Sequence, residues 1–191
     1  MTTKAPRKDT RNRNWMILVY PESTREDWKE TLNDLMIPWA CSPLHDKDTD
    51  DNGELKKPHY HCLLAFTNKK SYQQVLSIAK KLSAPNPKQC ENVKGLIRYF
   101  AHLDHPEKQQ YDVNQIVGYF GFDTTYYLQA TVAEKHNAQR EIRQFITENH
   151  ITELVSLYAY TDKHRPDWSS VINSQTYSIN KYIESTRYSN K

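Results

Sequence analysis

Apolar residues in the first two thirds of the chain occur in short runs that predict β-strands. Residues 15–20 form an aromatic-rich run that ends at Pro21, and residues 59–66 form a second run. Runs of this length and composition are typical of strands. Residues 39–44 are expected to be extended as well, and the segment around Cys90 is expected to form an edge strand. These runs predict four strands.

Three helices are predicted between and after these strands, because apolar residues recur at the spacing of an amphipathic helix. The first follows the sequence Ser23 to Glu26, which matches a capping box, and runs to about Leu35. The second covers Ser71–Leu82 and the third covers Val93–Leu103. This order of strands and helices predicts an α+β domain in which helices pack on an antiparallel sheet.

The pattern changes near residue 130, after which only helical stripes occur. We expect a boundary within residues 123–129, which separates a basic flexible arm (1–14) and a sheet domain (15–125) from a helical domain (130–191). Short helices without strands favour a separate all-α unit. The three predicted stripes are Ala138, Ile142, Phe145 and Ile146; Ile151, Leu154, Val155 and Tyr158; and, after Pro166, Val171, Ile172, Ile179, Tyr182 and Ile183.

Composition and charge are those of a folded protein with a basic N-terminal arm. Hydrophobic residues make up 37% and charged residues 26% of the 191 residues, which fits an ordinary soluble globular protein. The net charge is +3, yet residues 1–14 alone carry +4. Such an arm either contacts the phosphate backbone of a nucleic acid or is a disordered, solubilising tail. Composition alone leaves both interpretations open.

Several classes of protein are disfavoured by what the sequence lacks. The longest apolar run, residues 15–20, is too short to span a bilayer, and the N-terminus has no apolar signal core. We therefore expect a cytoplasmic protein with no membrane partner. Cys41, Cys62 and Cys90 show no CxxC spacing and are expected to be reduced, mostly buried thiols. Neither GxGxxG nor GxxxxGK occurs, which disfavours a nucleotide-binding site built on a glycine-rich loop.

The segment HDKDTDDNGELKKPHYHCLLAF contains the candidate chemistry. His59 and His61 are two apart in a predicted strand, so their imidazoles project from the same face. A hairpin through the Asn52-Gly53 turn would bring His45 and Asp48 beside them. Three imidazoles and one carboxylate that converge from adjacent strands predict a divalent-metal site.

Three other interpretations of this segment remain open. Two strand histidines can simply be satisfied by hydrogen bonds. Asp48, Asp50, Asn52 and Gly53 match the start of a calcium-binding EF-hand loop, but its twelfth position is His59, where a bidentate Glu is needed. A closed structural zinc site would be filled by four protein ligands and would need no nucleophile nearby.

Tyr99 is the candidate nucleophile. It lies on the predicted helix Val93–Leu103 beside the buried stripe, and its neighbours on the same face are Gly95 and His102. Gly95, one turn earlier, would leave space for a substrate. A purely structural tyrosine is the alternative for any one of the 13 tyrosines in the chain.

Three stretches resemble the RepB-type rolling-circle plasmid replication initiators, which belong to the HUH endonuclease superfamily. They are SPLHDKD (residues 42–48), KKPHYHCLLAF (residues 56–66) and VKGLIRYFAHLDHPEKQQYD (residues 93–112), and the opening WMILVYPES is similar as well. The resemblance covers roughly residues 14–123, with the motifs in the same order and at compatible spacing. The helical C-terminal segment resembles the family much less.

The resemblance implies a fold and a reaction. The fold is a five-stranded antiparallel sheet flanked by helices, followed by a small all-α domain. The reaction is site-specific nicking and joining of single-stranded origin DNA, with a 5′-phosphotyrosine link and a free 3′-OH primer. By motif, His59 and His61 are the paired histidines, His45 and Asp48 complete the metal shell, and Tyr99 is the single catalytic tyrosine.

The resemblance also implies partners in a bacterial cytoplasm. These are origin DNA, as a single-stranded or hairpin nick site plus duplex repeats, the host replication machinery, and further copies of the chain in a ring. Histidine-rich ligation favours Mn²⁺ over Mg²⁺. The rival functions are a viral or conjugative HUH nickase and a metal-stabilised DNA-binding module without catalysis. The residues expected to contact DNA are Lys47, Lys56, Lys57 and Arg98.

Overall fold

The computed structural model describes residues 10–189, which fall into two compact units with the chain boundary between Gln129 and Ala130. Most of the predicted basic arm, residues 1–9, lies outside the described residues. The last residues assigned to that arm are part of the fold, because the first strand already begins at Asn12. Among the described residues, no helix is both long and apolar enough to cross a membrane.

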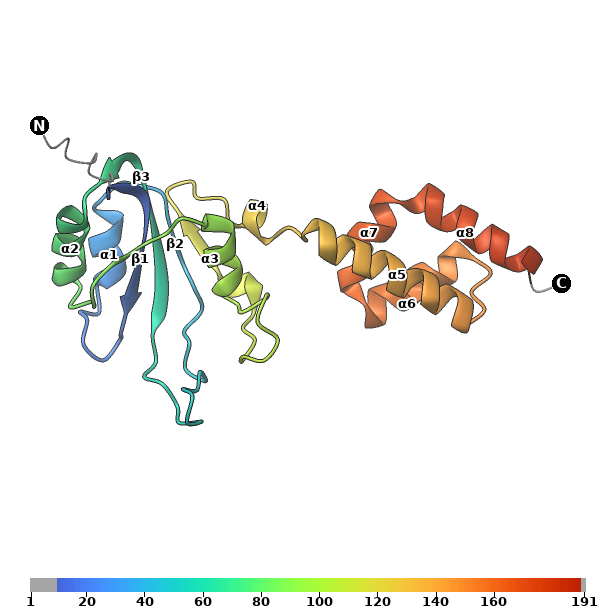
Figure 1. The fold of residues 1–191 in the computed structure, drawn as a ribbon, viewed down its shortest axis with the longest axis horizontal. Coiled ribbons are helices and arrows are strands. Elements are labelled where there is room, and N and C mark those ends of the chain that lie inside the picture. Colours follow the sequence, from blue (N-terminus) through green and yellow to red (C-terminus); the bar gives the residue numbers. More distant parts are fainter. Residues whose placement is uncertain (1–9, 190–191) are drawn as a thin grey trace, which may run out of the picture. The chain divides into compact units, whose positions relative to one another are not determined.

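The first unit is built on a five-stranded antiparallel sheet, which confirms the expected α+β fold. The strand order is β4-β1-β3-β2-β5, with the 11-residue β3 in the middle (Figure 1). The strands are β1 (Asn12–Val19), β2 (Trp39–Cys41), β3 (Tyr60–Lys70), β4 (Lys88–Gln89) and β5 (Val117–Tyr119).

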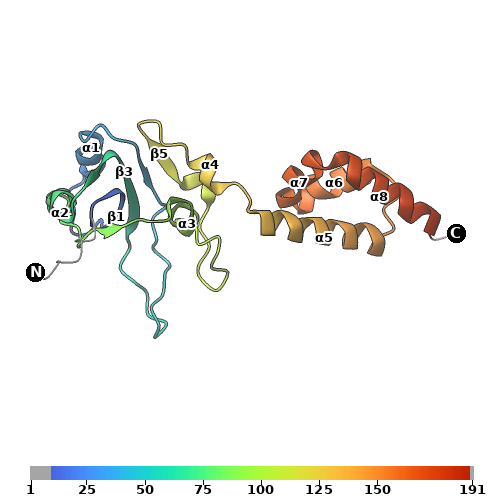
Figure 2. The same cartoon turned by 45° about the horizontal axis from the view of Figure 1, so that its top comes forward.

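Helices cover both faces of this sheet (Figures 1 and 2). On one face, α1 and α2 bury a core that includes Trp39 and Leu64. On the other face, α3 packs Ile97 and Phe100 against Leu63 of β3. Since side chains alternate along a strand, the residues of β3 that share a face with Leu63 point toward α3. The helices of this unit are α1 (Trp28–Asn33), α2 (Tyr72–Lys81), α3 (Val93–Tyr99), the 3₁₀ turn η1 (Val113–Gln115) and α4 (Thr124–Leu128).

Two predicted helix boundaries are wrong. The predicted capping box at Ser23 is instead a turn, in which the backbone N–H groups of Ser23 and Thr24 both donate to the carbonyl of Tyr20, each at 3.1 Å. The helix starts later, at Trp28. The helix predicted to reach Leu103 ends at Tyr99, and a chain of turns follows it.

Over its described residues, 130–189, the second unit contains helices and no strand. It has its own core, whose buried residues include Ile142, Leu157 and Trp168. One predicted stripe is partly wrong, because Val155 is 71% exposed and Leu157 takes its place in the core. The longest helix, α5, starts with a capping box in which Thr131 and Glu134 bond each other's backbone N–H groups. The elements are α5 (Val132–Glu148), α6 (Leu154–His164), the 3₁₀ turn η2 (Pro166–Trp168), α7 (Ser169–Ser174) and α8 (Thr176–Ser189).

Candidate metal centre

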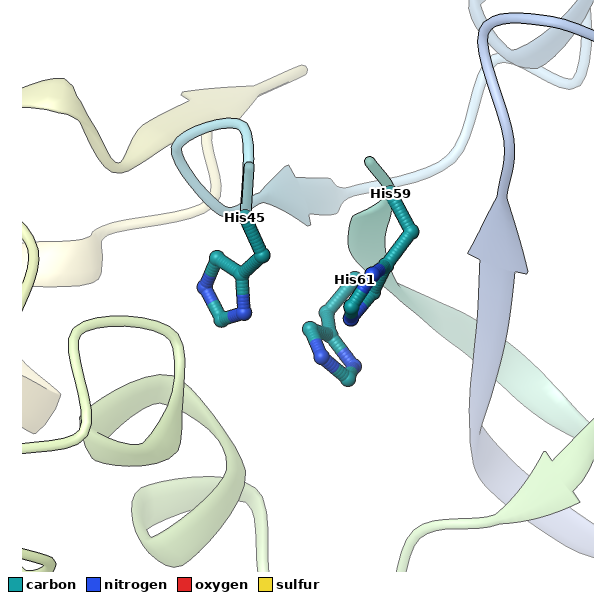
Figure 3. Close-up of side chains that lie close together, drawn as sticks. All are labelled: His45, His59 and His61. Atoms are coloured by element: carbon teal, nitrogen blue, oxygen red, sulfur yellow. The ribbon is translucent and has the colours of Figure 1, made fainter. Parts of the chain in front are cut away.

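The paired histidines lie at the start of β3 on the face that α3 covers. His59 directly precedes β3, and His61 is its second residue. Their ring centroids are 5.0 Å apart, so the two imidazoles lie side by side (Figure 3). Alternation along the strand places them with Leu63, toward Phe100, whose ring centroid is 6.2 Å from that of His61.

A hairpin turn between the strands brings His45 to the same place. Gly53, with φ of +82°, makes the turn, and its N–H donates to the Asp50 carbonyl at 3.0 Å. His45 and His59 then face each other, and their backbones exchange hydrogen bonds of 2.9 and 3.2 Å. One ring nitrogen from each of His45, His59 and His61 lies within 4.8 Å of the others, which is close enough for a shared metal ion.

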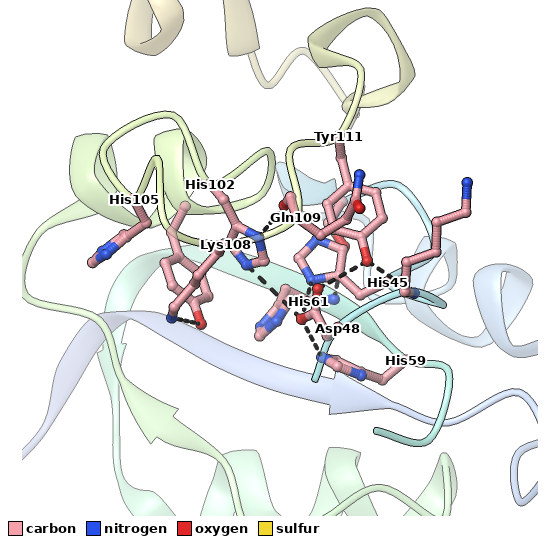
Figure 4. Close-up of polar contacts among 12 residues, drawn as sticks. His45, Asp48, His59, His61, His102, His105, Lys108, Gln109 and Tyr111 are labelled. Atoms are coloured by element: carbon pink, nitrogen blue, oxygen red, sulfur yellow. Dashed lines mark hydrogen bonds and ion pairs between the residues drawn. The ribbon is translucent and has the colours of Figure 1, made fainter. Parts of the chain in front are cut away.

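Asp48 adds a carboxylate to the three imidazoles. Its Oδ2 is 3.3 Å from His45 Nδ1 and 4.0 Å from His59 Nε2 (Figure 4). Donor atoms bound to one octahedral ion at about 2.1 Å lie about 3 Å apart when adjacent and about 4 Å apart when opposite. The two separations from Asp48 fall in this range, so Asp48 can share a divalent cation with His45 and His59.

Two of the imidazoles, those of His45 and His59, are held in the tautomer that a metal needs. His45 Nε2 bonds the Phe100 carbonyl and His59 Nδ1 bonds the Lys57 carbonyl, each at 2.8 Å. A carbonyl only accepts, so the bonded nitrogen carries the proton and the other nitrogen keeps its lone pair. His45 Nδ1 and both ring nitrogens of His61 are buried without a hydrogen-bond partner among the described residues. Such orphaned atoms are what a bound cation would satisfy.

Burial also keeps two of these rings neutral. It lowers the pKa of His45 below the ordinary value, since the charged form would lose its hydration. For His61, burial together with the neighbouring imidazoles lowers the pKa to about 2. Neutral imidazole is the form that binds metals, so the site is ready for a cation at neutral pH.

Tyr99 is the last residue of α3 and lies next to this cluster. Its ring centroid is 5.4 Å from that of His61, with the two planes nearly perpendicular. The Tyr99 hydroxyl accepts a hydrogen bond of 3.2 Å from Lys108 Nζ, which also lies 4.7 Å from the centre of the ring. The side chain is partly exposed, so a substrate can reach it.

Two residues beside the cluster, Tyr111 and His102, were not predicted as site residues from the sequence. Tyr111 stacks on His45 with parallel planes at 4.2 Å, and its hydroxyl donates to Asp48 Oδ1 at 2.8 Å. Burial raises the pKa of Tyr111, which keeps this hydroxyl protonated. His102, noted only as a neighbour of Tyr99, has Nε2 3.9 Å from Asp48 Oδ2. Both residues come from loops, where no periodic pattern marks them.

Comparison with known proteins decides the family. Residues 7–125 match the family described as "Plasmid replication protein, origin binding domain", and residues 132–188 match "Replication protein RepB, C-terminal". The chain belongs to the RepB-type plasmid replication initiators. A "Replication protein" of Staphylococcus aureus is 39% identical over 184 residues, which are 95% of this chain and 92% of the relative. "Replication protein RepB" of Lactiplantibacillus plantarum is 40% identical over 186 residues, 96% of this chain and 84% of the relative.

The residues that this replication initiator was expected to use on DNA lie in different settings. Lys47, Lys56 and Lys57 are exposed on the hairpin, although Lys57 Nζ pairs with Glu22 at 2.6 Å. Arg98 is only 3% exposed, and its guanidinium binds both carboxylate oxygens of a neighbouring aspartate, Asp104. A buried guanidinium engaged within the fold does not suit a DNA contact, so we leave Arg98 out of that role.

In the hairpin, Asp50 has a structural role that differs from the calcium-binding role considered above. Asp50 Oδ1 accepts the backbone N–H groups of Asn52 at 2.9 Å and Glu54 at 3.0 Å. The carboxylate thereby closes the turn, as Asp commonly does in turns. The residue groups of the described chain that could hold a metal ion contain Asp48 but not Asp50.

Proposed function

We propose that this replication initiator nicks and rejoins single-stranded origin DNA by a metal-dependent transesterification at Tyr99. The observation that carries the proposal is the position of a partly exposed tyrosine ring 5.4 Å from a histidine of a metal-compatible cluster. The origin-binding family supports DNA as the partner of this unit. A phenol beside a cation site is an arrangement suited to covalent attack on a phosphodiester.

In this proposal His45, Asp48, His59 and His61 hold the cation. Their mixture of imidazoles and one carboxylate favours Mn²⁺, with Mg²⁺ as the alternative. A divalent cation bound there would supply Lewis-acid stabilisation of the charge on the non-bridging phosphate oxygens. The lysines of the hairpin, Lys47, Lys56 and Lys57, are exposed and would contact flanking phosphates.

The chemical step exchanges one phosphoester for another. The Tyr99 oxygen forms a bond to phosphorus while the bond from phosphorus to the 3′ oxygen breaks. Tyr99 loses its proton and the departing 3′ oxygen gains one, so bonds and protons balance. Lys108 places a positive charge 3.2 Å from the oxygen that becomes negative, which stabilises it electrostatically. Because the phosphotyrosine link conserves the ester, a later 3′-OH can reverse the step, and until then the 3′-OH can prime the host polymerase.

A covalent adduct tests the proposal directly. We would incubate the full chain with a single-stranded origin oligonucleotide and Mn²⁺ and look for a denaturant-resistant protein–DNA band. Wild type and Tyr72→Phe should form it, since Tyr72 lies on α2, on the other face of the sheet. Tyr99→Phe should bind origin DNA without forming it. An adduct with Tyr99→Phe would refute the nucleophile, and no adduct with wild type would favour a DNA-binding module without catalysis.

We assign nicking and origin binding to residues 15–125 and assembly into a ring to the helical unit at 130–191. The assembly role is what the family resemblance implies, and the helices of this unit carry exposed apolar side chains at Val132, Val155 and Tyr177. Sedimentation equilibrium of the full chain should give a multiple of the mass of one chain. A single species with the mass of one chain, at concentrations that saturate origin binding, would refute the ring.

A further inference from the structure

His102 lies outside the proposed ligand set, yet its ring faces the same carboxylate. The side chain is 1% exposed, and its ring centroid is 4.8 Å from that of His45. Its Nε2 is 3.9 Å from Asp48 Oδ2, beyond hydrogen-bonding distance (Figure 4). One donor atom from each of His45, Asp48 and His102 lies within 4.8 Å of the other two. This group therefore has the spacing of atoms that share one ion.

The tautomer of His102 is fixed in the same way as those of His45 and His59. His102 Nδ1 bonds the backbone carbonyl of Gln109 at 2.7 Å, so the proton is on Nδ1. The lone pair is then on Nε2, which is buried without a hydrogen-bond partner among the described residues. Metal-binding histidines commonly donate their second ring nitrogen to a backbone carbonyl in this manner.

The backbone is shaped to hold the ring in this position. His102 has φ of +56°, a left-handed conformation that is uncommon outside glycine. The loop that follows is fastened to it, because the Gln110 side-chain amide donates to the carbonyls of His102, His105 and Lys108 at 2.9–3.1 Å. A strained conformation that the surroundings over-determine points to a function at that residue.

We infer that His102 Nε2 is a further ligand of the cation in the metal centre, an inference that rests on the proposed function. With His102 the centre has four imidazoles and one carboxylate. Five protein donors exceed the four of a closed tetrahedral zinc site and suit an ion of higher coordination, such as Mn²⁺. Such an ion would still accept one phosphate oxygen.

Titration of Mn²⁺ into the metal-free full chain tests this inference by calorimetry. His102→Asn keeps a residue that tolerates the left-handed backbone but shortens the side chain and removes the imidazole. The dissociation constant for Mn²⁺ should rise at least about tenfold, the smallest loss expected when even an outer partner of a metal ligand is removed. His105→Asn is the matched control, since His105 also lies near Tyr99 but is bonded to Glu107 and is not among the grouped ligands. An unchanged constant in His102→Asn, with or without loss of nicking, would overturn the inference.

Two readouts separate the possible failures. A wild-type chain that binds no Mn²⁺ would refute the metal centre itself, whereas wild-type binding with an unaffected His102→Asn variant would refute only the role of His102. Electron–nuclear double resonance on the wild-type Mn²⁺ complex needs no variant and therefore holds even if His102→Asn does not fold. Four directly bound imidazole nitrogens are expected, and three would overturn the inference.

Discussion

Replacement of Tyr111 by Phe would test how far the surroundings of the site control metal binding. The change removes a single oxygen, which donates to Asp48 Oδ1 at 2.8 Å and accepts the backbone N–H of Lys47 at 3.2 Å. The aromatic ring remains and can keep its stacking on His45, with centroids 4.2 Å apart. The substitution therefore isolates the hydrogen bond that orients the carboxylate.

The expected magnitude follows from the burial of Asp48, which is 9% exposed. A hydrogen bond to a charged group typically contributes about 1.5–3 kcal/mol. Loss of an outer partner of a metal ligand lowers metal affinity by about 10–100-fold, which corresponds to about 1.4–2.8 kcal/mol. The two ranges agree, so we expect the dissociation constant for Mn²⁺ to rise by about 10–100-fold in Tyr111→Phe.

Calorimetric titration of Mn²⁺ measures this change, and Tyr119→Phe serves as the matched control. Tyr119 also stacks on an aromatic ring, that of Trp39 at 3.9 Å, but it belongs to β5 and to the core on the other face of the sheet. The control should bind Mn²⁺ as wild type does. If Tyr111→Phe bound Mn²⁺ within twofold of wild type, the carboxylate would be oriented without this hydroxyl and the reasoning would be refuted.

Four other measurements test the same architecture. Lys108→Gln should slow formation of the Tyr99 adduct at least about tenfold without changing Mn²⁺ affinity, and equal rates would exclude an electrostatic role. Ile97→Ala should lower the free energy of unfolding in urea by about 2–5 kcal/mol, because Ile97 is fully buried; a loss under about 1 kcal/mol would contradict its place in the core. Burial raises the pKa of Cys90 to about 11, so iodoacetamide at neutral pH should label it slowly until urea unfolds the chain; rapid labelling of the folded protein would contradict this. Because burial lowers the pKa of His61 from 6.5 to about 2, the unfolded state binds the extra proton, and the free energy of unfolding of the metal-free protein should fall as pH drops below 6.5. At pH 5 the low pKa of His61 should reduce the free energy of unfolding by about 2 kcal/mol. If the free energy of unfolding of His61→Asn fell by the same amount, His61 would not be the cause of the fall.

The part of the site that lies on a strand and its hairpin could be predicted because strand geometry is local. A period of two fixes His59 and His61 on one face, and the Asn52-Gly53 turn returns the chain so that His45 meets them. None of these steps depends on long-range packing. The helical stripe that carries Ile97 was predictable for the same reason.

The rest of the site depends on where helices end and how loops return, which local patterns do not encode. The spacing of apolar residues predicted that the helix runs to Leu103, but α3 ends at Tyr99. His102 lies in the turns that follow the helix. Tyr111 reaches Asp48 across 63 residues of sequence. Strand β5 has three residues, of which Val117 is exposed, so it carries no periodic signal, and the fifth strand was expected from the family resemblance alone.

Under the proposed function, both the geometry and the charge of this site suit a phosphodiester. Three backbone carbonyls, from Phe100, Lys57 and Gln109, each hold one imidazole in a fixed tautomer, and they belong to three separate segments. Each unprotonated nitrogen can therefore be in place before any ion arrives, which limits the reorganisation that binding requires. Asp48 contributes a single carboxylate beside these rings. A divalent cation beside it leaves a net charge of +1, and one phosphodiester carries the −1 that neutralises it, whereas a second carboxylate would remove that attraction.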